Sequence, residues 1–457
     1  MHFTQHYLSC LSHASYLIGD DSSLRAVVVD PQRDISAYLA EAEASHLTIE
    51  LIVETHIHAD FVSGHLELAR ATGAEIAYGA GADIDFPVQY LVDGERIALG
   101  DVVLEVRATP GHTPESISVV VWRRPSDASP YGVLTGDTLF IGDVGRPDLL
   151  AAAGHEPEEM ARDLYRSLQT QLLTLPDSTR IFPAHGAGSA CGRQLSTERQ
   201  STIGEQRQDN YALQATSEDA FVQLVTEGQP ARPRYFEHDA RRNREAHPLF
   251  DEREAPRLLS IDRLLELRSN GTQVLDTRPP DEFALAHVAG SINVGLDGRF
   301  AEFAGAVLDP QAGIVLVCDP GSELESKLRL ARVGFDDVEG ALADPMVAFL
   351  DHPEVVAQAR RRTAHELDGA TLVDVRGPGE TELGSIPDAR LIPLARLLDD
   401  LDDLDRDAPT VVYCAGGYRS SIAASVLRAN GFTDVADLIG GYAAWQDSQM
   451  AAERPSQ

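Results

Sequence analysis

The chain contains almost no lysine. Its 38 basic residues are all arginine except Lys327, and they are outnumbered by 72 acidic residues, which gives a net charge of −34. Nucleic acids and anionic membranes attract proteins that carry an excess of positive charge. The acidic excess therefore argues against either of them as a partner.

Cysteine is also scarce, and long apolar runs are missing. The four cysteines stand far apart in the sequence, at Cys10, Cys191, Cys318 and Cys414. This spacing excludes a disulfide framework and is typical of a reducing compartment. No apolar run reaches the ~20 residues that span a bilayer, and the N-terminus lacks the segments of a signal peptide. We expect a cytoplasmic protein.

The length of 457 residues predicts about three domains of ~150 residues each. Residues 1–245 alternate short apolar strands with loops that carry His or Asp. Residues 232–256, rich in Arg, Asp, Glu and Pro, predict a linker or an extended packed segment. An internal repeat divides the remainder into residues 246–355 and 356–457.

The repeat is clearest at two places. Val274–Arg278 matches Leu372–Arg376, and Gly334-Phe335 matches Gly431-Phe432. Strands and helices alternate through each copy. This alternation predicts two small α/β domains with parallel sheets.

A histidine-rich motif follows the apolar run at residues 48–53. His56, His58 and Asp60 stand at alternate positions just past this predicted strand, where they can converge on one metal ion. Imidazole and carboxylate ligands suit zinc or non-haem iron. A second metal ion would call for a ligand at the next position, and Phe61 cannot coordinate one. The motif therefore favours a single ion with open positions.

Three further candidate ligands lie on loops that follow predicted strands: His112 in Thr-Pro-Gly-His, Asp137 in Thr-Gly-Asp and His185 in Pro-Ala-His-Gly. A rigid sheet can aim the side chains at its strand ends toward one point. We therefore expect one metal centre at this edge.

Together with residues 142–149 and 184–192, these motifs resemble the metallo-β-lactamase superfamily and, within it, the persulfide dioxygenases. The resemblance implies an αββα sandwich with one iron(II) ion held by His56, His112 and Asp137. It implies supporting or substrate-binding roles for a further set, His58, Asp60, His185, Arg146 and Cys191. Arg146 is expected either to bind a thiol carrier's carboxylate or to pair with Asp148.

The implied reaction is the oxidation of a thiol persulfide, of the glutathione or coenzyme A type, by dioxygen to sulfite. Two histidines and one carboxylate leave open positions on iron(II), which this chemistry needs. A zinc-dependent thioester hydrolase of the glyoxalase II type is the alternative on the same scaffold.

A cysteine loop, residues 414–419, follows the predicted strand at residues 411–413 and precedes a helical run. Consecutive backbone N–H groups at a helix N-terminus form an anion cradle. Such a cradle, with Arg419 nearby, favours the thiolate of Cys414, which can carry a sulfane sulfur. The cradle residues are Ala415, Gly416, Gly417 and Tyr418.

This loop resembles that of the rhodaneses, which are thiosulfate sulfurtransferases. Four residues separate Cys414 from Arg419, whereas cysteine phosphatases usually have five, so sulfur transfer is favoured. In the first repeat Val317 aligns with Cys414, Cys318 stands one place off, and Asp319 interrupts the cradle. We therefore expect residues 246–355 to be an inactive rhodanese-like domain.

The complete chain resembles fusions of a persulfide dioxygenase with rhodanese domains, which implies a role in sulfide detoxification. The expected partners are a thiol persulfide, dioxygen, and sulfite or thiosulfate, and we expect a homo-oligomer. Two alternatives remain open. One is a zinc thioester hydrolase joined to a sulfurtransferase, and the other is a non-enzymatic sulfur or redox sensor that uses Cys414 as its switch.

Overall fold

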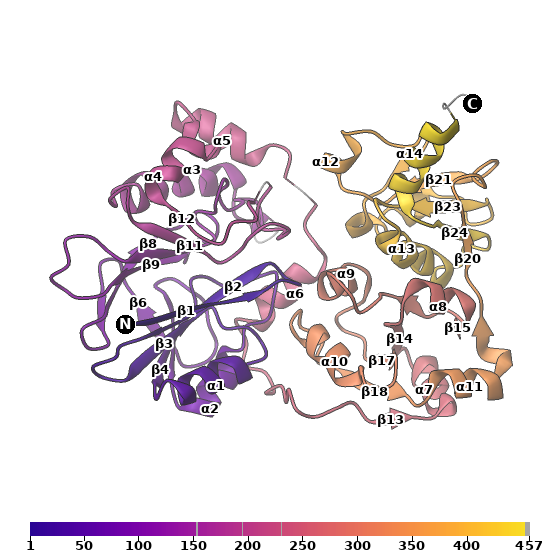
Figure 1. The fold of residues 1–457 in the computed structure, drawn as a ribbon, viewed down its shortest axis with the longest axis horizontal. Helices are drawn as coiled ribbons and strands as arrows, with labels where there is room; N and C mark the ends of the chain where they lie inside the picture. The colour runs from indigo at the N-terminus through magenta and orange to yellow at the C-terminus, as the bar shows by residue number, and fades with distance from the viewer. Residues whose placement is uncertain (152–153, 194, 230, 453–457) are drawn as a thin grey trace. The chain divides into compact units, whose positions relative to one another are not determined.

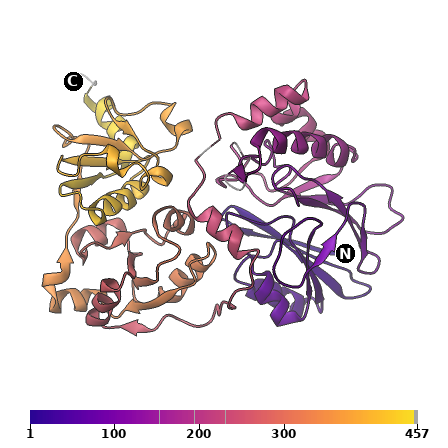
Figure 2. The same ribbon diagram turned by 180° about the vertical axis from the view of Figure 1, so that it is seen from behind.

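The computed structural model describes residues 1–151, 154–193, 195–229 and 231–452. The chain divides into two units, Met1–Phe250 and Asp251–Gln457, shown from opposite sides in Figures 1 and 2. Each unit has its own sheets and its own apolar clusters.

The first unit contains two six-stranded sheets. The first sheet has the order β1 (His2–Leu8), β2 (His13–Gly19), β3 (Arg25–Val29), β4 (Thr48–Val53), β5 (Glu75–Gly79) and β6 (Gln89–Leu91). The second has the order β12 (Ser201–Thr202), β11 (Arg180–Pro183), β10 (Gly132–Gly136), β9 (Ile117–Trp122), β8 (Val103–Ala108) and β7 (Arg96–Ala98).

The strands are apolar on both faces because the sheets are covered on both sides. In β3, Val27 and Val29 point into the cluster between the sheets, whereas Ala26 and Val28 point into the cluster outside the first sheet. Successive side chains of a strand alternate between its two faces. A continuous apolar run therefore predicts a strand buried on both sides, as β3 is.

Helices cover the two outer faces, which completes an αββα sandwich (Figure 1). Helices α1 (Ser36–Ala44) and α2 (His65–Thr72) pack outside the first sheet. The helices outside the second sheet are α3 (Pro157–Ser167), which continues as a π-helical turn (Leu168–Leu172), α4 (Ile203–Asp209) and α5 (Glu218–Thr226).

The predicted linker contains a helix, α6 (Tyr235–Arg242), which the sequence interpretation missed. Its charged residues conceal an amphipathic pattern in which Tyr235 and Phe236 are buried beside the buried Asp239. The helix ends at Asn243, which bonds to a loop of the candidate site described below.

The second unit contains two five-stranded parallel sheets with equivalent strand orders. The first repeat has the order β13 (Leu258–Leu259), β18 (Val338–Leu342), β17 (Ile314–Val317), β14 (Gln273–Asp276) and β16 (Ile292–Asn293). The second has the order β20 (Arg360–Arg362), β24 (Val435–Leu438), β23 (Thr410–Tyr413), β21 (Thr371–Asp374) and β22 (Arg390–Leu391). A short antiparallel pair, β15 (His287–Val288) and β19 (Val356–Ala357), completes the strands.

The two repeats also share a buried ion pair at the end of the equivalent strands β14 and β21. Arg278 binds Asp276 through two nitrogens, and Arg376 binds Asp374 in the same way. The helices of the second unit are α7 (Ile261–Ser269), α8 (Pro280–Leu285), α9 (Phe300–Val307), α10 (Glu323–Ala331), α11 (Pro345–Asp351), α12 (Pro378–Thr381), α13 (Tyr418–Ala429) and α14 (Gly441–Ala452).

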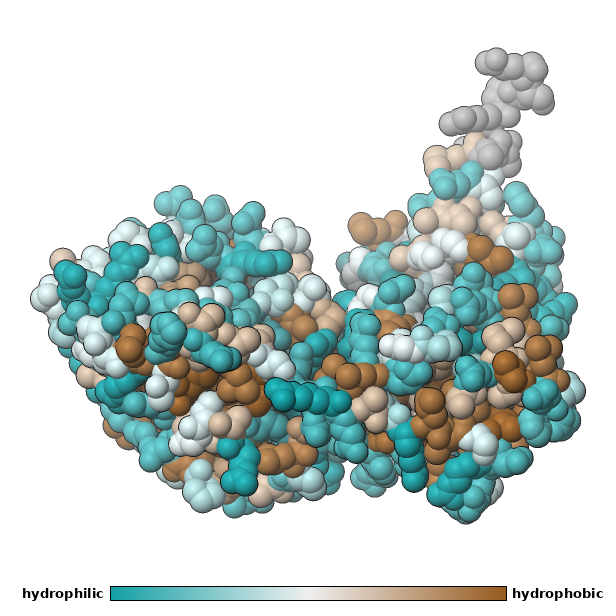
Figure 3. Space-filling model, turned by 60° about the horizontal axis from the view of Figure 1, so that its bottom comes forward, coloured by the Kyte–Doolittle hydropathy of each residue, from teal (hydrophilic) through white to brown (hydrophobic). Residues whose placement is uncertain are grey.

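Hydrophilic side chains predominate on the face drawn in Figure 3, with apolar ones interspersed. No helix among the described residues is both long enough and apolar enough to cross a bilayer. None of the four cysteines forms a disulfide bond in the structure.

Tyr16 links the two sheets of the first unit. Its hydroxyl donates to the carbonyl oxygen of Pro183 at 2.6 Å, and it accepts from the side chain of Gln5 at 3.0 Å. Pro183 ends β11 two residues before His185. This bond therefore fixes the end of β11, two residues before the candidate site residue His185.

We expect Tyr16→Phe to lower the free energy of unfolding of the first unit by about 1–2 kcal/mol, because a buried carbonyl loses its donor. Urea unfolding followed by Trp122 fluorescence in a Trp445→Phe background reports on this unit alone. Tyr90→Phe, at an exposed site, is the control and should change nothing. Equal stability of the Tyr16 variant and the parent would contradict the assignment.

Candidate metal centre and cysteine loop

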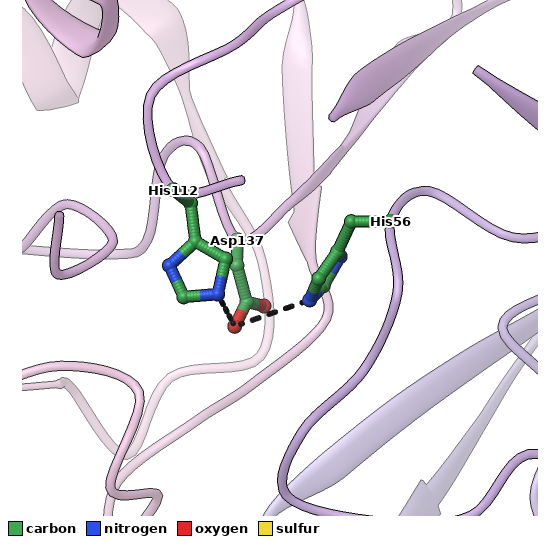
Figure 4. A group of neighbouring side chains, drawn as sticks. All are labelled: His56, His112 and Asp137. Carbon is green, nitrogen blue, oxygen red and sulfur yellow. Dashed lines mark ion pairs between the residues drawn. The ribbon is translucent and has the colours of Figure 1, made fainter. Parts of the chain in front are cut away.

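Three loops bring His56, His112 and Asp137 together, and Figure 4 shows their polar atoms pointing toward one another. Oδ2 of Asp137 lies 3.4 Å from Nε2 of His112 and 3.8 Å from Nε2 of His56. All three side chains are almost completely buried. These separations are those of donor atoms around one ion at bond lengths of about 2 Å.

Hydrogen bonds on the far side of each ring hold the two histidines in this orientation. Nδ1 of His112 donates to the carbonyl oxygen of Arg146 at 3.0 Å. Nδ1 of His56 lies 3.0 Å from the hydroxyl of Thr55, which donates in turn to Asp30. Such bonds select the ring tautomer whose Nε2 lone pair faces the ion.

The three residues fit a divalent metal ion. Both carboxylate oxygens of Asp137 are buried without a hydrogen-bond donor. Burial raises the pKa of this carboxyl to about 6 and lowers the pKa of His112 to about 4. The imidazole is therefore neutral, as a ligand must be, and an ionised Asp137 needs a cation beside it.

His58 is held from the opposite side. Its Nε2 lies 3.1 Å from Asp30 and 3.2 Å from Glu54, both buried. Burial disfavours the charged ring, but the two carboxylates outweigh it and raise the pKa of His58 well above its ordinary value. His58 thus forms a buried ion pair behind the centre, in a supporting position rather than among the three convergent residues.

Asp60, His185 and Cys191 lie on another side of Asp137. Nε2 of His185 is 3.3 Å from Asp60 and 3.6 Å from Oδ1 of Asp137. The Cys191 sulfur lies within 4.8 Å of the donor atoms of Asp137 and His185. Burial raises the pKa of Cys191 well above its ordinary value and lowers that of His185.

Arg146 is committed to internal bonds. Two of its nitrogens donate to Asp148 at 2.8 Å, and a third donates to the carbonyl oxygen of Ala190 at 3.1 Å. Of the two roles weighed from the sequence, the geometry matches pairing with Asp148. Through its own carbonyl oxygen, Arg146 also orients His112.

The sequence interpretation missed Asn243, because it lies far along the chain from the loop that it holds. Its side-chain nitrogen donates to the carbonyl oxygens of His58 and Phe61, both at 2.8 Å, and its oxygen accepts from the N–H of Ser63 at 2.9 Å. Three bonds from one amide thus fix the turn after the His-x-His motif.

His13 was also missed. It is completely buried, and neither ring nitrogen has a hydrogen-bond partner among the described residues. Its ring centroid lies 4.0 Å from that of Phe61 and 5.5 Å from that of His185. No sequence motif surrounds this residue.

The cysteine loop closes around a nearly buried sulfur. The N–H of Gly417 donates to Sγ of Cys414 at 3.1 Å, and Sγ lies 3.7 Å from the hydroxyl of Ser420. The carbonyl of Cys414 points away and accepts from the N–H of Tyr442 in α14 at 2.7 Å. Turning that carbonyl outward leaves the sulfur facing backbone donors.

Arg419 faces Glu380 from α12. Its two terminal nitrogens each donate to a different oxygen of that carboxylate at 2.6 Å. The sequence drew attention to Arg419 and not to its partner, because Glu380 precedes it by 39 residues. The arginine is therefore held rigidly at the edge of the loop.

The strand registers correct the alignment of the two repeats. Asp276 pairs with Val317 and Asp374 pairs with Tyr413, so Cys318, and not Val317 as expected from the sequence, is equivalent to Cys414. The environment of Cys318 nevertheless differs. Cys318 is buried, and burial together with Glu323, Asp276 and Asp319 raises its pKa to about 12. The loop that follows contains Asp319 and Pro320 in place of the residues that surround Cys414.

Models of two protein families match the chain. The metallo-β-lactamase superfamily model matches residues 8–185, and the rhodanese-like domain model matches residues 260–343 and 356–448. A crystal structure of a metallo-β-lactamase from Staphylococcus aureus subsp. aureus COL aligns with a TM-score of 0.67 and 32% identity, over 74% of this chain and 98% of that one. The fold and the convergent histidines and aspartate define a protein of the metallo-β-lactamase class.

Two curated relatives refine this placement. Persulfide dioxygenase ETHE1 from Homo sapiens is 32% identical over 216 residues, which cover 46% of this chain and 75% of that protein. A beta-lactamase hydrolase-like protein from Xylella fastidiosa (strain 9a5c) is 31% identical over 244 residues, and the chain spans about half of its length. The chain belongs to the family of the persulfide dioxygenases within that superfamily, and it continues into two rhodanese-like domains. The predicted fold class, a sandwich followed by two parallel-sheet domains, is confirmed.

We expect Asn243→Ala to destabilise the first unit by about 3 kcal/mol, because three buried bonds disappear at about 1 kcal/mol each. The loop that Asn243 holds contains His58 and lies next to His56, so the amount of metal bound per chain should also fall. Metal analysis after gel filtration measures this, and Asn270→Ala in the second unit is the control. Full metal content with unchanged stability would contradict the proposed role of the Asn243 hydrogen bonds.

Gly441 approaches the cysteine loop closely. Its φ is +60°, and an added Cβ would lie 2.3 Å from the carbonyl oxygen of Cys414 and 2.7 Å from that of Ala415. We expect Gly441→Ala to displace the loop and to change the rate at which iodoacetamide alkylates Cys414 by more than about tenfold. Gly431→Ala shares the strained φ but meets open space, so it should cost about 1 kcal/mol of stability and keep the alkylation rate of the parent.

Proposed function

We propose that the first unit oxidises a thiol persulfide, of the glutathione or coenzyme A type, with dioxygen to sulfite at one iron(II) ion held by His56, His112 and Asp137. The observation that carries this proposal is the convergence of two neutral imidazoles on one buried carboxylate without a donor. Family membership supports the choice of chemistry. Iron(II) in this site would supply open coordination positions and the redox chemistry of sulfur oxidation.

The residues around the centre have separate tasks in this proposal. The carbonyl oxygen of Arg146 and the hydroxyl of Thr55 orient His112 and His56. Asp30 and Glu54 fix His58 through its Nε2, and His58 also has a ring nitrogen within 4.8 Å of donor atoms of Asp60 and His185. Asp60, His185 and Cys191 border Asp137 on another side, where polar groups can contact the substrate. Burial of the whole set excludes bulk water from the oxidation.

The second repeat would transfer sulfur through Cys414. The thiolate attacks the outer sulfur of thiosulfate, the S–S bond breaks, and sulfite leaves with the bonding electron pair. A carrier thiolate then attacks the outer sulfur of the cysteine persulfide, which forms a thiol persulfide and regenerates the Cys414 thiolate. In the opposite direction, sulfite and persulfide yield thiosulfate. The N–H of Gly417 donates to the sulfur and supports its anionic form.

Residues 246–355 take no direct part in this transfer. Cys318 has a pKa raised to about 12, so it remains a thiol at neutral pH, and the thiol is a poor nucleophile.

A zinc-dependent thioester hydrolase is a second candidate, and one observation favours it. Asp60 and His185 lie beside Asp137, where a second metal ion of a dinuclear hydrolase would bind. Against it, the ring of Phe61 is held between His13 and His58 and supplies no ligand. Metal content and oxygen consumption separate the two candidates.

The proposal is tested by dioxygen consumption of the iron-loaded full chain with glutathione persulfide or coenzyme A persulfide. We expect the parent to consume dioxygen. In His112→Ala the rate of consumption should fall more than about 100-fold, because loss of a metal ligand lowers activity more than loss of a residue that only orients a ligand. Cys414→Ser should keep the uptake and change the product from thiosulfate to sulfite.

Cys10→Ser is the matched control for the cysteine variant, because Cys10 lies outside both sites. It should behave as the parent in both assays. Absence of uptake with either persulfide would overturn the dioxygenase assignment and favour the hydrolase, and unchanged thiosulfate in Cys414→Ser would overturn the transfer step.

A further inference from the structure

Helix α13 begins directly after the cysteine loop and is covered on two sides. Ser420 to Leu427 are all buried, eight consecutive residues of a helix. One side packs on β23 and β24 of its own sheet. The other side faces the first repeat, as Figures 1 and 2 show by placing α13 beside α8 and α9.

Bonds at the middle of α13 join it to the first repeat. The hydroxyl of Ser421 donates to the side-chain oxygen of Asn293 at 2.9 Å, and the N–H of Asn293 donates to the hydroxyl of Ser425 at 2.9 Å. The side-chain nitrogen of Asn293 donates to the carbonyl oxygens of Asp276 and Arg278 in its own domain. Asn293 thus anchors the helix to the first repeat's sheet.

The ends of α13 make further contacts with the same domain. At the N-terminal end, the hydroxyl of Tyr418 donates to the carbonyl oxygen of Gly295 at 2.5 Å, and its ring packs edge-on against Phe303 at 5.6 Å between centroids. At the other end, the guanidinium of Arg428 lies over the ring of Phe283 at 5.9 Å. The first repeat therefore contacts the helix along its length.

These contacts act close to the reactive sulfur. Gly417, which donates its N–H to Cys414, is bonded directly to Tyr418, and Ser420 belongs to the first turn of α13. A shift of the helix N-terminus would change both groups that face the sulfur. The N–H of Gly417, which donates to the sulfur, and the hydroxyl of Ser420, which accepts from it, are therefore positioned from two directions, by the helix's own sheet and by the first repeat.

We propose that the rhodanese-like domain without a reactive loop serves as a positioning domain for Cys414, and that Tyr418 is the positioning residue through which it acts. The inference rests on the proposed sulfur transfer at Cys414 and gives a task to residues 246–355. Tyr418 fixes the loop through Gly295 and Phe303. Neither of those residues touches the transferred sulfur.

The test compares two variants of the full chain on opposite sides of the contact. Tyr418→Phe removes the hydroxyl bond and keeps the ring, and Phe303→Ala removes the packing from within the first repeat. For each, the alkylation rate of Cys414 by iodoacetamide is followed by peptide mass spectrometry across pH. Transfer of sulfur from thiosulfate to cyanide is measured in parallel.

We expect the half-maximal alkylation rate of both variants to move to higher pH by about one unit, which lowers the thiolate fraction at neutral pH about tenfold. The kcat of transfer should fall by a similar factor, with a smaller change in KM. Ser425→Ala removes one contact without opening a large cavity, so it should show a smaller shift in the same direction even if Phe303→Ala folds poorly.

Tyr413→Phe is the matched control. The Tyr413 hydroxyl accepts from the N–H of Ile386 inside the second repeat at 3.0 Å and does not reach the first repeat. This variant should lose stability and keep the alkylation profile of the parent. Parent-like profiles in Tyr418→Phe and Ser425→Ala would overturn the positioning role. Because alkylation does not require transfer, a parent that alkylates but transfers no sulfur overturns the proposed function alone.

Discussion

The buried carboxylate of Asp30 is the constraint on which the loop carrying His56 and His58 depends. It accepts from the N–H and the hydroxyl of Thr55 and from the ring of His58. Through Thr55 it also determines the ring orientation of His56. One anion at the end of β3 thereby orders the loop after the neighbouring strand β4. His112 and Asp137 lie against His56 in that loop. A buried carboxylate is stable only where such donors surround it.

Local patterns indicated the candidate site residues more readily than their supports. His56, His112 and Asp137 each stand in a short motif after a strand, and the family resemblance singled out these three. They lie together although β4 belongs to one sheet and β8 and β10 belong to the other. Asn243 has no such signal, because it acts through an amide at the end of a helix 185 residues away from His58. The many charged residues of α6 also concealed that helix in the sequence, because its buried face is evident only from the packing in the structure.

The two repeats place different loops on the same frame. Strand order and the buried Asp–Arg pair are the same in both. The difference lies in one turn, where Asp319 and Pro320 follow Cys318, whereas Ala415 and Gly416 follow Cys414. The sequence predicted this difference, because glycine and proline act locally. It did not predict the pairing of Arg419 with Glu380, which depends on how two distant segments fold together.

Helix α13 is buried between the two repeats, and this has a thermodynamic consequence. A helix with eight consecutive buried residues cannot leave one partner without exposing apolar surface that the other leaves uncovered. The two repeats should therefore melt as one cooperative transition, and either repeat expressed alone should aggregate.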